Sequence, residues 1–363
     1  MKDLARKEIL KMMPYVPGKP IDDVKREYGI DKVVKLASNE NPIGASVKVK
    51  AAISEALDTI HLYPDGYVYN LREKLAEKFN VEMNRLIFGD GTDEIIELLF
   101  KAFVNKDDEI IFAEQTFVEY ERNTLLMGGK SVKIPMGLGL RHDMDAIAAA
   151  INVNTKMIFI CNPNNPTGTI VSKNEVDEFL SKIPDNIFVV FDEAYFEYAV
   201  DDKDYPNSMY YQKKGYKNVI TLRTFSKAFG LAGLRIGYGI ADLEVIEMLE
   251  KVRLPFNVGN LAQAGAIAAI NDIEHMRKSV AINKEGKEYL YEEFDKLGFT
   301  YPKTYANFIY VDTGINGKEL FEKLLKKGVI VRAMPGSAIR ITIGTMEENR
   351  FFIEKLKEVL GKW

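Results

Sequence analysis

The chain has 363 residues, and its 49 Lys and Arg against 53 Asp and Glu give a formal net charge of −4. Hydrophobic residues make up 47% and charged residues 28%, a globular composition that excludes extensive disorder. The mildly acidic balance, without a long basic run, argues against nucleic acid or an anionic membrane surface as a partner.

The cysteine and histidine content limits the chemistry further. Cys161 is the only cysteine and cannot form an intrachain disulfide, and three histidines do not complete a Cys/His metal cage. We therefore expect no metal site. The amino terminus lacks an apolar signal-peptide core, and no apolar run is long enough to cross a membrane. These features predict a soluble, reduced, cytoplasmic protein.

In chain order, short apolar or β-branched runs alternate with longer helical patterns. The runs predict strands at 85–88, 109–113, 131–134, 156–161, 187–191, 219–224 and 237–240. Helical patterns such as 92–104 and 173–182 lie between several of them. This alternation is typical of an α/β fold with a mostly parallel central sheet sandwiched by helices.

After Pro255 the pattern changes to one long helical stretch, 261–297, followed by shorter elements. The shorter elements are predicted strands at 308–312, 329–331 and 339–343, a helix at 317–327 and a helix at the end of the chain. We therefore predict a large domain at residues 41–254 and a smaller α+β domain at 255–363. The N-terminal arm, residues 1–40, is expected to join the smaller domain in part.

Two of the predicted strands end in chemically active side chains. One leads into Asp192, with Tyr195 three residues later, and the next leads through Ser226 to Lys227. Ligands of α/β sheets lie beyond the carboxyl ends of strands, and one crossover connection would return Lys227 to the same edge as Asp192. A helix N-cap is an equally good interpretation of Asp192 alone. Apolar neighbours predict a desolvated Lys227, whose lowered pKa makes the amine nucleophilic.

Two stretches rich in small residues predict a phosphate site. Arg235 lies in one of them, where the backbone can approach an anion, and Thr224 and Ser226 add hydroxyl donors. In the other, a Gly-rich turn leads into a predicted helix at Thr92 and Asp93, and amides at a helix start bind phosphate. The plainer interpretations are a surface salt bridge for Arg235 and simple helix capping for the turn.

Two arginines near the C-terminus are candidates for a second anion site. Arg332 and Arg340 lie in apolar, strand-like runs with seven residues between them, and such a pair suits a carboxylate or a phosphate. Either side chain could instead point to solvent. Upstream, the string Asn165-Pro-Thr-Gly is more specific than a generic turn, whereas Cys161 is predicted to be a small buried apolar residue.

The order and spacing of Asn165-Pro-Thr-Gly, Asp192-Glu-Ala-Tyr195, Ser226-Lys227 and Arg235 resemble those of the pyridoxal-phosphate-dependent aminotransferases of fold type I. The resemblance covers nearly the whole chain. Strings such as Ser38-Asn-Glu-Asn-Pro, Tyr63-Pro-Asp, Gly91-Thr-Asp-Glu and Pro255-Phe-Asn-Val are similar to those of the histidinol-phosphate aminotransferase branch. The resemblance implies pyridoxal 5'-phosphate as cofactor and a large domain with a mostly parallel sheet beside a smaller α+β domain.

The resemblance also implies a role for each of these residues. Lys227 would bond to the cofactor and carry the proton, Asp192 would hold the pyridine nitrogen protonated, and Tyr195 would donate to the ring oxygen. Asn165 would bind the same oxygen, and Phe117 would stack on the ring. Thr224 would also bind the cofactor, and the phosphate would be held by the backbone at Thr92 and Asp93, by Ser226 and Arg235, and by Tyr63 of a neighbouring subunit. That last role implies a homodimer with shared active sites.

For the reaction, the resemblance implies transamination of L-histidinol phosphate with 2-oxoglutarate, which gives imidazole-acetol phosphate and glutamate. Arg332 and Arg340 would bind the phosphate ester or the carboxylate, with Tyr15 and Asn39 beside them. The segment 333–339 is shorter than the branch usually has. An aromatic aminotransferase or a threonine-phosphate decarboxylase on the same scaffold stays open, as does a cofactor-binding regulator without catalytic activity.

Overall fold

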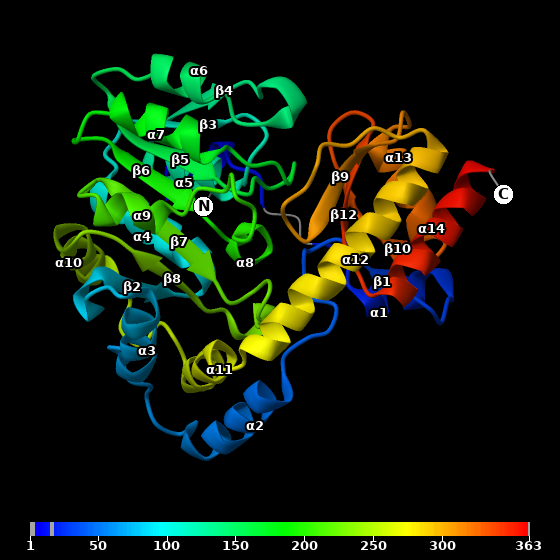
Figure 1. The fold of residues 1–363 in the computed structure, drawn as a ribbon, viewed down its shortest axis with the longest axis horizontal. Helices are drawn as coiled ribbons and strands as arrows, with labels where there is room; N and C mark the ends of the chain where they lie inside the picture. The colour runs from blue at the N-terminus through cyan, green and yellow to red at the C-terminus, as the bar shows by residue number, and fades with distance from the viewer. Residues whose placement is uncertain (1–3, 15–17, 362–363) are drawn as a thin grey trace.

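The computed structural model describes residues 4–14 and 18–361, which form a larger and a smaller unit bridged by one long helix (Figure 1). The larger unit contains a seven-stranded sheet in the order β2-β8-β7-β6-β5-β3-β4. Its strands are β2 (Leu86–Gly89), β3 (Glu109–Ala113), β4 (Lys130–Ile134), β5 (Thr155–Cys161), β6 (Phe188–Asp192), β7 (Val219–Thr224) and β8 (Gly237–Ile240). The strands all run in one direction except β8, which is antiparallel to β2 on one side and to β7 on the other. The predicted mostly parallel sheet is therefore confirmed.

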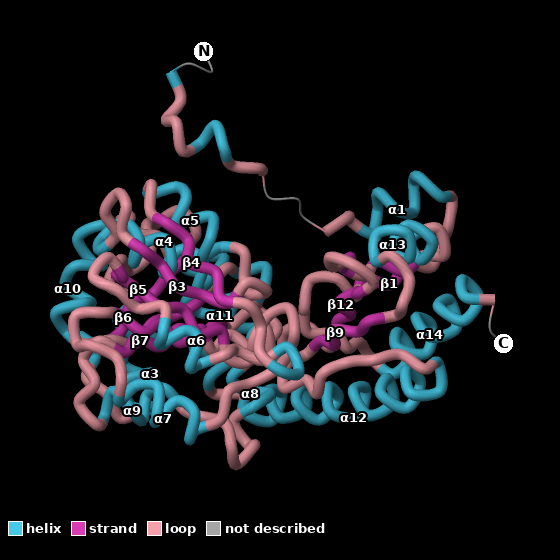
Figure 2. The backbone as a smooth tube through the Cα atoms, turned by 90° about the horizontal axis from the view of Figure 1, so that it is seen from above, coloured by secondary structure: helices cyan, strands magenta, loops and turns pink. Residues whose placement is uncertain are grey.

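Helices cover both faces of this sheet, so its strands are apolar on both sides (Figure 2). One layer packs on the face that carries Ile110 and consists of α4 (Gly91–Phe103), α5 (Glu119–Met127) and α10 (Leu243–Val252). The other packs on the face that carries Ile111 and consists of α6 (Met144–Ala149), α7 (Lys173–Ser181) and α9 (Ser208–Lys213). Ile110 and Ile111 point to opposite faces because side chains alternate along a strand.

A third group of helices packs at the β2 and β8 edge of the sheet. It consists of α2 (Val47–Ala56), α3 (Tyr69–Phe79) and α11 (Asn260–Ile270). Helix α11 buries Ala262 and Ala266 in the same cluster as Phe88, although it follows residue 254, where the sequence predicts the large domain to end. We propose that the change of domain lies farther along, within α12 (Ile273–Leu297).

The predicted continuous helical stretch at 261–297 is wrong, because α11 and α12 are separate helices. The break falls at Asn271 and Asp272, residue types whose short polar side chains favour helix ends over helix interiors. Asp272 also pairs with Lys48 of α2 at 3.1 Å. Helix α12 then continues for 25 residues and bridges the two units (Figure 1).

The smaller unit contains a three-stranded antiparallel sheet in the order β11-β12-β9. Its strands are β9 (Phe308–Asp312), β11 (Arg332–Ala333) and β12 (Ala338–Thr342), and its helices are α1 (Ile21–Tyr28), α13 (Gly317–Leu325) and α14 (Met346–Leu360). Leu290 and Phe294 of α12 complete its core. A separate parallel pair, β1 (Val34–Lys35) with β10 (Val329–Ile330), brings the N-terminal segment into this unit.

The remaining elements are short. The helix α8 (Phe196–Ala199) follows β6, and single 3₁₀ turns occur at Ile9–Lys11, Leu57–Thr59, Met83–Arg85, Leu138–Leu140 and Ala232–Leu234. In the part of the chain that the structure describes, no helix combines the length and the apolar character that a membrane span requires.

Candidate active site

The carboxyl ends of the parallel strands border a cavity of about 550 Å³ that residues of both units line. Strand β6 ends at Asp192 and its parallel neighbour β7 ends at Thr224, two residues before Ser226. Strand β2 ends at Gly89, opposite the first residue of β8, so α4 begins at the same edge. Residues that are distant in sequence therefore meet at one place.

The structure brings thirteen of the predicted site residues to this cavity. They are Asn39, Thr92, Asp93, Phe117, Asn165, Asp192, Tyr195, Thr224, Ser226, Lys227, Arg235, Arg332 and Arg340. Tyr63 does not line it: its side chain is 82% exposed, and its ring stacks on Phe256 with centroids 4.8 Å apart. Tyr15 lies outside the described residues.

The amine of Lys227 lies inside the cavity, where its Nζ donates to the carbonyl oxygen of Ser38 at 3.5 Å. Desolvation, helped by the positive charge of Arg340, lowers the pKa of Lys227 to about 8. About a tenth of the amine is therefore neutral at pH 7, far more than for a solvated lysine. The neutral amine is the nucleophilic form. The desolvated Lys227 with a lowered pKa agrees with the prediction from its apolar neighbours in the sequence.

Asp192 is 2% exposed and is held by two donors. The hydroxyl of Tyr120 donates to Oδ2 at 2.7 Å and the amide of Ala194 donates to Oδ1 at 3.3 Å. Burial raises the pKa of Asp192 to about 6, against the opposing effect of the Tyr120 hydrogen bond. Asp192 caps no helix, because α8 begins only after Tyr195. It is thus a buried carboxylate that is mainly ionised at neutral pH.

The sequence reasoning missed Tyr120. This residue lies on α5, its ring stacks on Phe159 with centroids 4.3 Å apart, and the edge of Phe117 packs against it. Its contact with Asp192 joins residues 72 positions apart. No local motif marks it, since a buried tyrosine on a helix is an ordinary core residue. The ion pair between Glu119 and Arg122, which also lines the cavity, was missed for the same reason.

Two asparagines orient the polar groups in the middle of the cavity. Asn39 donates from Nδ2 to the Tyr195 hydroxyl at 2.8 Å, so its amide supports Tyr195. Asn165 accepts at Oδ1 from Arg340 Nη1 at 2.5 Å. Because Arg340 occupies the Asn165 oxygen, the amide nitrogen of Asn165 is the group left to donate to a ligand.

The predicted phosphate site has the form of a cup at the start of α4. Arg235 pairs with Asp90 Oδ1 at 2.8 Å and with Asp93 Oδ2 at 3.0 Å, so it makes salt bridges and also lines the cavity. Gly91 has φ +65°, and a Cβ there would lie 2.7 Å from Arg235 Nη2. The positive φ favours glycine at this position, and the missing side chain leaves room for the Arg235 guanidinium beside the start of the helix. The first-turn amides of α4 have no intrahelical acceptor and are available to an anion.

The two C-terminal arginines face each other across a tight hairpin. Arg332 of β11 is the register partner of Arg340 of β12, so both lie on one face and both line the cavity. Arg340 Nη2 also donates to the carbonyl oxygen of Ala37 at 2.7 Å, and its guanidinium lies 5.3 Å from the Phe308 ring centroid. The short segment between the arginines is what places them opposite each other.

The donor set of the cavity suits pyridoxal phosphate. A nucleophilic amine at Lys227 can take up an aldehyde, and the buried carboxylate of Asp192 can accept from a protonated pyridine nitrogen. Tyr195 and Asn165 offer groups to a ring oxygen, and the cup at α4 offers amides and a guanidinium to a phosphate. Each polar part of the cofactor thus has a partner among residues that line one cavity.

Comparison with known proteins gives a consistent result. The family described as aminotransferase class I and II matches residues 31–356. The chain is 51% identical to histidinol-phosphate aminotransferase of Moorella thermoacetica, over 98% of this chain and 93% of the relative. It is 48% identical to the enzyme of that name from Caldicellulosiruptor saccharolyticus, over 98% and 100%.

Solved structures show the same fold. Histidinol-phosphate aminotransferase from Sinorhizobium meliloti, in complex with pyridoxal-5'-phosphate, superposes with a TM-score of 0.90 at 24% identity, covering 99% of this chain and 98% of that one. Aspartate aminotransferase from Thermus thermophilus with maleate gives a TM-score of 0.84 at 24% identity, covering 98% and 99%.

Proposed function

This chain belongs to the class I and II aminotransferases, and we propose that it transfers the amino group of L-histidinol phosphate to 2-oxoglutarate in histidine biosynthesis. The relatives at 48–51% identity carry that name over nearly the whole chain. The observation that carries the proposal is the arrangement of one cavity, in which Arg332 and Arg340 face the same space as Lys227 and Asp192.

The cofactor is pyridoxal phosphate, which when bound supplies a positively charged ring that stabilises negative charge on the substrate carbon next to the amino group. Lys227 would hold it through its amine, and that amine, once freed by the incoming substrate, would remove and return the proton at the substrate carbon. Asp192 would keep the ring nitrogen protonated, because a buried carboxylate with a pKa near 6 is mainly ionised at pH 7. Tyr120 and Ala194 donate to Asp192 and hold it in place.

Arg332 and Arg340 select the substrate by charge. A phosphate ester dianion takes hydrogen bonds from two guanidinium groups, and the carboxylate of 2-oxoglutarate uses the same pair in the second half-reaction. Hydrogen bonds to Ala37 and Asn165 fix the guanidinium of Arg340, whose backbone lies opposite that of Arg332, so this part of the site exists before substrate arrives. Asn39, which donates to the Tyr195 hydroxyl, lines the same cavity.

An exposed apolar surface supports a homodimer. It comprises Ile60, Leu62, Tyr63, Tyr67, Leu254 and Phe256, with exposed fractions of 44–82%. Tyr63 stacks on Phe256 within the chain, which joins the two segments into one patch. Contiguous apolar patches of this kind mark protein interfaces. We propose that a second copy covers the patch and that Tyr63 completes the phosphate site of the neighbouring subunit.

A cytoplasmic location stays a prediction.

The experiment that tests the proposed function is the visible absorbance of the purified protein with single amino donors and no keto acid. L-histidinol phosphate should abolish the band of the lysine-bound cofactor faster than glutamate or phenylalanine does. A response to phenylalanine alone would keep the mechanism and change the substrate. No band after supplying pyridoxal phosphate would overturn the cofactor assignment.

A further inference from the structure

The phosphate cup rests on a turn that other side chains hold in shape. This turn, Gly89–Asp90, connects β2 to α4, and its space is tight: a Cβ on Gly89 would lie 2.9 Å from Ile95 Cγ1. The amide of Asp90 donates to Glu94 Oε2 at 2.6 Å, which closes the first turn of α4 from inside the helix. Asp90 in turn pairs with Arg235, so the position of the turn sets the position of the guanidinium.

Asn257 bridges the two sides of this turn from a distant part of the chain. Its Nδ2 donates to the carbonyl oxygen of Phe88 at 3.0 Å and to Glu94 Oε2 at 2.8 Å. Phe88 precedes the turn and Glu94 follows it, so one amide group ties together the strand end and the helix start. Asn257 lies in the loop between α10 and α11, and no sequence pattern predicts a role for it.

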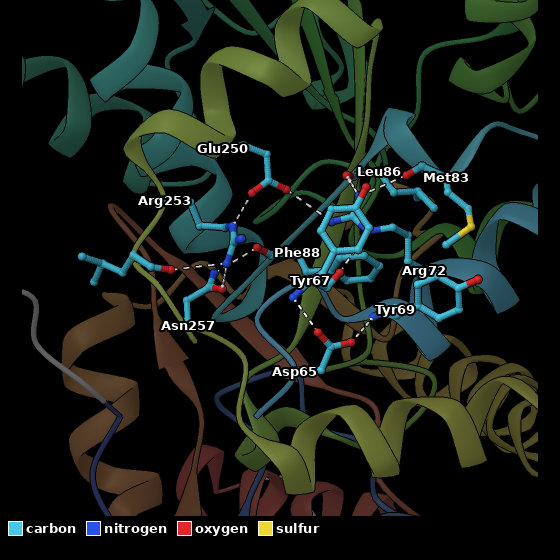
Figure 3. Close-up of polar contacts among 11 residues, drawn as sticks. Asp65, Tyr67, Tyr69, Arg72, Met83, Leu86, Phe88, Glu250, Arg253 and Asn257 are labelled. Atoms are coloured by element: carbon cyan, nitrogen blue, oxygen red, sulfur yellow. Dashed lines mark hydrogen bonds and ion pairs between the residues drawn. The ribbon is translucent and has the colours of Figure 1, made fainter. Parts of the chain in front are cut away.

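The orientation of the Asn257 amide is itself fixed. Arg253 Nη1 donates to Asn257 Oδ1 at 2.9 Å (Figure 3). This contact leaves Nδ2 to donate to Phe88 and Glu94. Arg253 Nε donates to Glu250 Oε2 at 2.7 Å. The other Glu250 oxygen accepts from Arg72. These contacts form a continuous chain of hydrogen bonds behind the phosphate cup.

Arg72 anchors this chain in the interior. The residue is 2% exposed, and its guanidinium donates to the carbonyl oxygens of Tyr67, Met83 and Leu86 (Figure 3). A buried guanidinium with four acceptors is held rigidly, because each unmade bond would leave a desolvated donor. Asn257 is therefore oriented from a fixed point and not by the cup itself.

We propose that Asn257 and Glu94 are positioning residues for the cofactor phosphate, which hold the Gly89–Asp90 turn so that the first-turn amides of α4 and Arg235 converge on one anion. Neither side chain lines the cavity, so they act through the turn and not by contact. The inference rests on the proposed function only in taking pyridoxal phosphate as the cofactor. It does not depend on which amino donor the enzyme uses.

The test compares the affinity of the full-length apoprotein for pyridoxal phosphate with its affinity for pyridoxal, which lacks the phosphate. Asn257→Ala removes the three hydrogen bonds of this amide. We expect the dissociation constant of pyridoxal phosphate to rise about tenfold, while that of pyridoxal changes less than about twofold. Fluorescence titration gives both constants without any measurement of turnover.

Charge variants sharpen the test. Asn257→Asp places a carboxylate against Glu94 and should weaken pyridoxal phosphate binding more than Asn257→Ala does. Glu94→Gln should stay within about threefold of the unsubstituted protein, since an amide oxygen can still accept from Asp90. Combining Asn257→Asp with Glu94→Gln should restore part of the lost affinity, because the introduced amide can donate to the introduced carboxylate.

Asn218→Ala is the matched control. Asn218 also donates to two backbone carbonyls, those of Pro184 and Ile187. It lies at the amino end of β7, whereas the cup lies at the carboxyl ends of the parallel strands. It should lower the melting temperature and leave both affinities unchanged.

Three results would decide against the proposal. Equal losses for pyridoxal phosphate and pyridoxal in Asn257→Ala would show a general structural role, and unchanged affinities would show none. Failure of the double variant to recover affinity would contradict the contact between Asn257 and Glu94. An unsubstituted apoprotein that binds neither compound would instead overturn the cofactor of the proposed function, and this inference with it.

Discussion

The two ends of the cavity bind anions by different constructions. Within one chain, the residues of the phosphate cup come from the larger unit: the turn before α4, the end of β7 and Arg235. The arginine pair at the other end comes from the β11–β12 hairpin of the smaller unit, and Arg340 depends on Ala37 and Asn165 for its position. The cofactor end is thus set within one packed unit, whereas the substrate end is set by the way the two units meet.

The largest expected effect lies between the two ends, at Lys227. Lys227→Ala removes the nucleophilic amine and little core volume, so we expect transamination to be abolished while the protein folds. Turnover assays with circular dichroism check both parts. Normal turnover in this variant would contradict the role assigned to Lys227. It would also show that catalysis does not take place between the phosphate cup and the arginine pair.

Asp192→Asn should come next, with a fall in kcat of about a thousandfold. The amide cannot keep the ring nitrogen protonated, although it preserves the size of a residue that is 2% exposed. Affinity for each anion should change much less than kcat, and steady-state kinetics separate the two. An unaffected kcat would reduce Asp192 to a packing residue.

Paired substitutions separate the ends directly. Arg332→Gln should raise the KM for histidinol phosphate by about ten- to a hundredfold, the value of a charge-assisted contact, and should leave the affinity for pyridoxal phosphate unchanged. Arg235→Gln should weaken the binding of pyridoxal phosphate and leave the KM for histidinol phosphate unchanged. If either substitution weakened both ligands to the same degree, the two ends would not be independent sites.

A pH dependence links the ends through Lys227. Because the protonated amine is not a nucleophile, the rate at which the apoprotein captures pyridoxal phosphate should rise with pH around a midpoint near 8, where Lys227 titrates. Removing the positive charge in Arg340→Gln should raise the pKa of Lys227 and move the midpoint upward, whereas Asp93 and Glu40 act in the opposite direction. A midpoint above 10 would show a solvated amine.

The smallest expected effect is that of Tyr120→Phe, a few-fold to about tenfold loss of kcat. Its hydroxyl stabilises the ionised form of Asp192, so the pKa of Asp192 should rise above about 6 in the variant. The loss should therefore be larger at pH 6 than at pH 8, where the carboxylate ionises again. An equal loss at both pH values would indicate a packing defect.

The sequence predicts the fold well where the signal is local. Strands β3, β7, β8 and β9 have the predicted bounds, because buried parallel or central strands are short apolar runs with polar ends. The strand-end residues Asp192 and Lys227 follow from that pattern, since parallel strands end at one edge. The two-residue strands β1 and β11 and the break between α11 and α12 were missed, because tertiary pairing and single polar residues decide them.

The site residues divide in the same way. Gly91, Arg235 and Ser226 lie in recognisable strings, whereas Tyr120 is placed by a helix packed across the sheet. The support of Tyr195 by Asn39 joins positions 156 residues apart, and that of Arg340 by Ala37 joins positions 303 apart. Local sequence patterns do not predict contacts between such distant positions, because these contacts depend on how the two units pack.

Helix α12 connects the two units that border the cavity (Figure 1). Its 25 residues make it about 38 Å long. Near its start Ser279 accepts from Asn41, which also contacts the loop after Lys227, and farther along Leu290 and Phe294 are buried in the smaller unit. Because this continuous helix is held at both ends, we expect it to keep the distance between Lys227 and the arginine pair constant. We therefore expect amines to be sorted by the number of bonds between nitrogen and anion, so that a longer homologue of the substrate is rejected despite carrying the same charges.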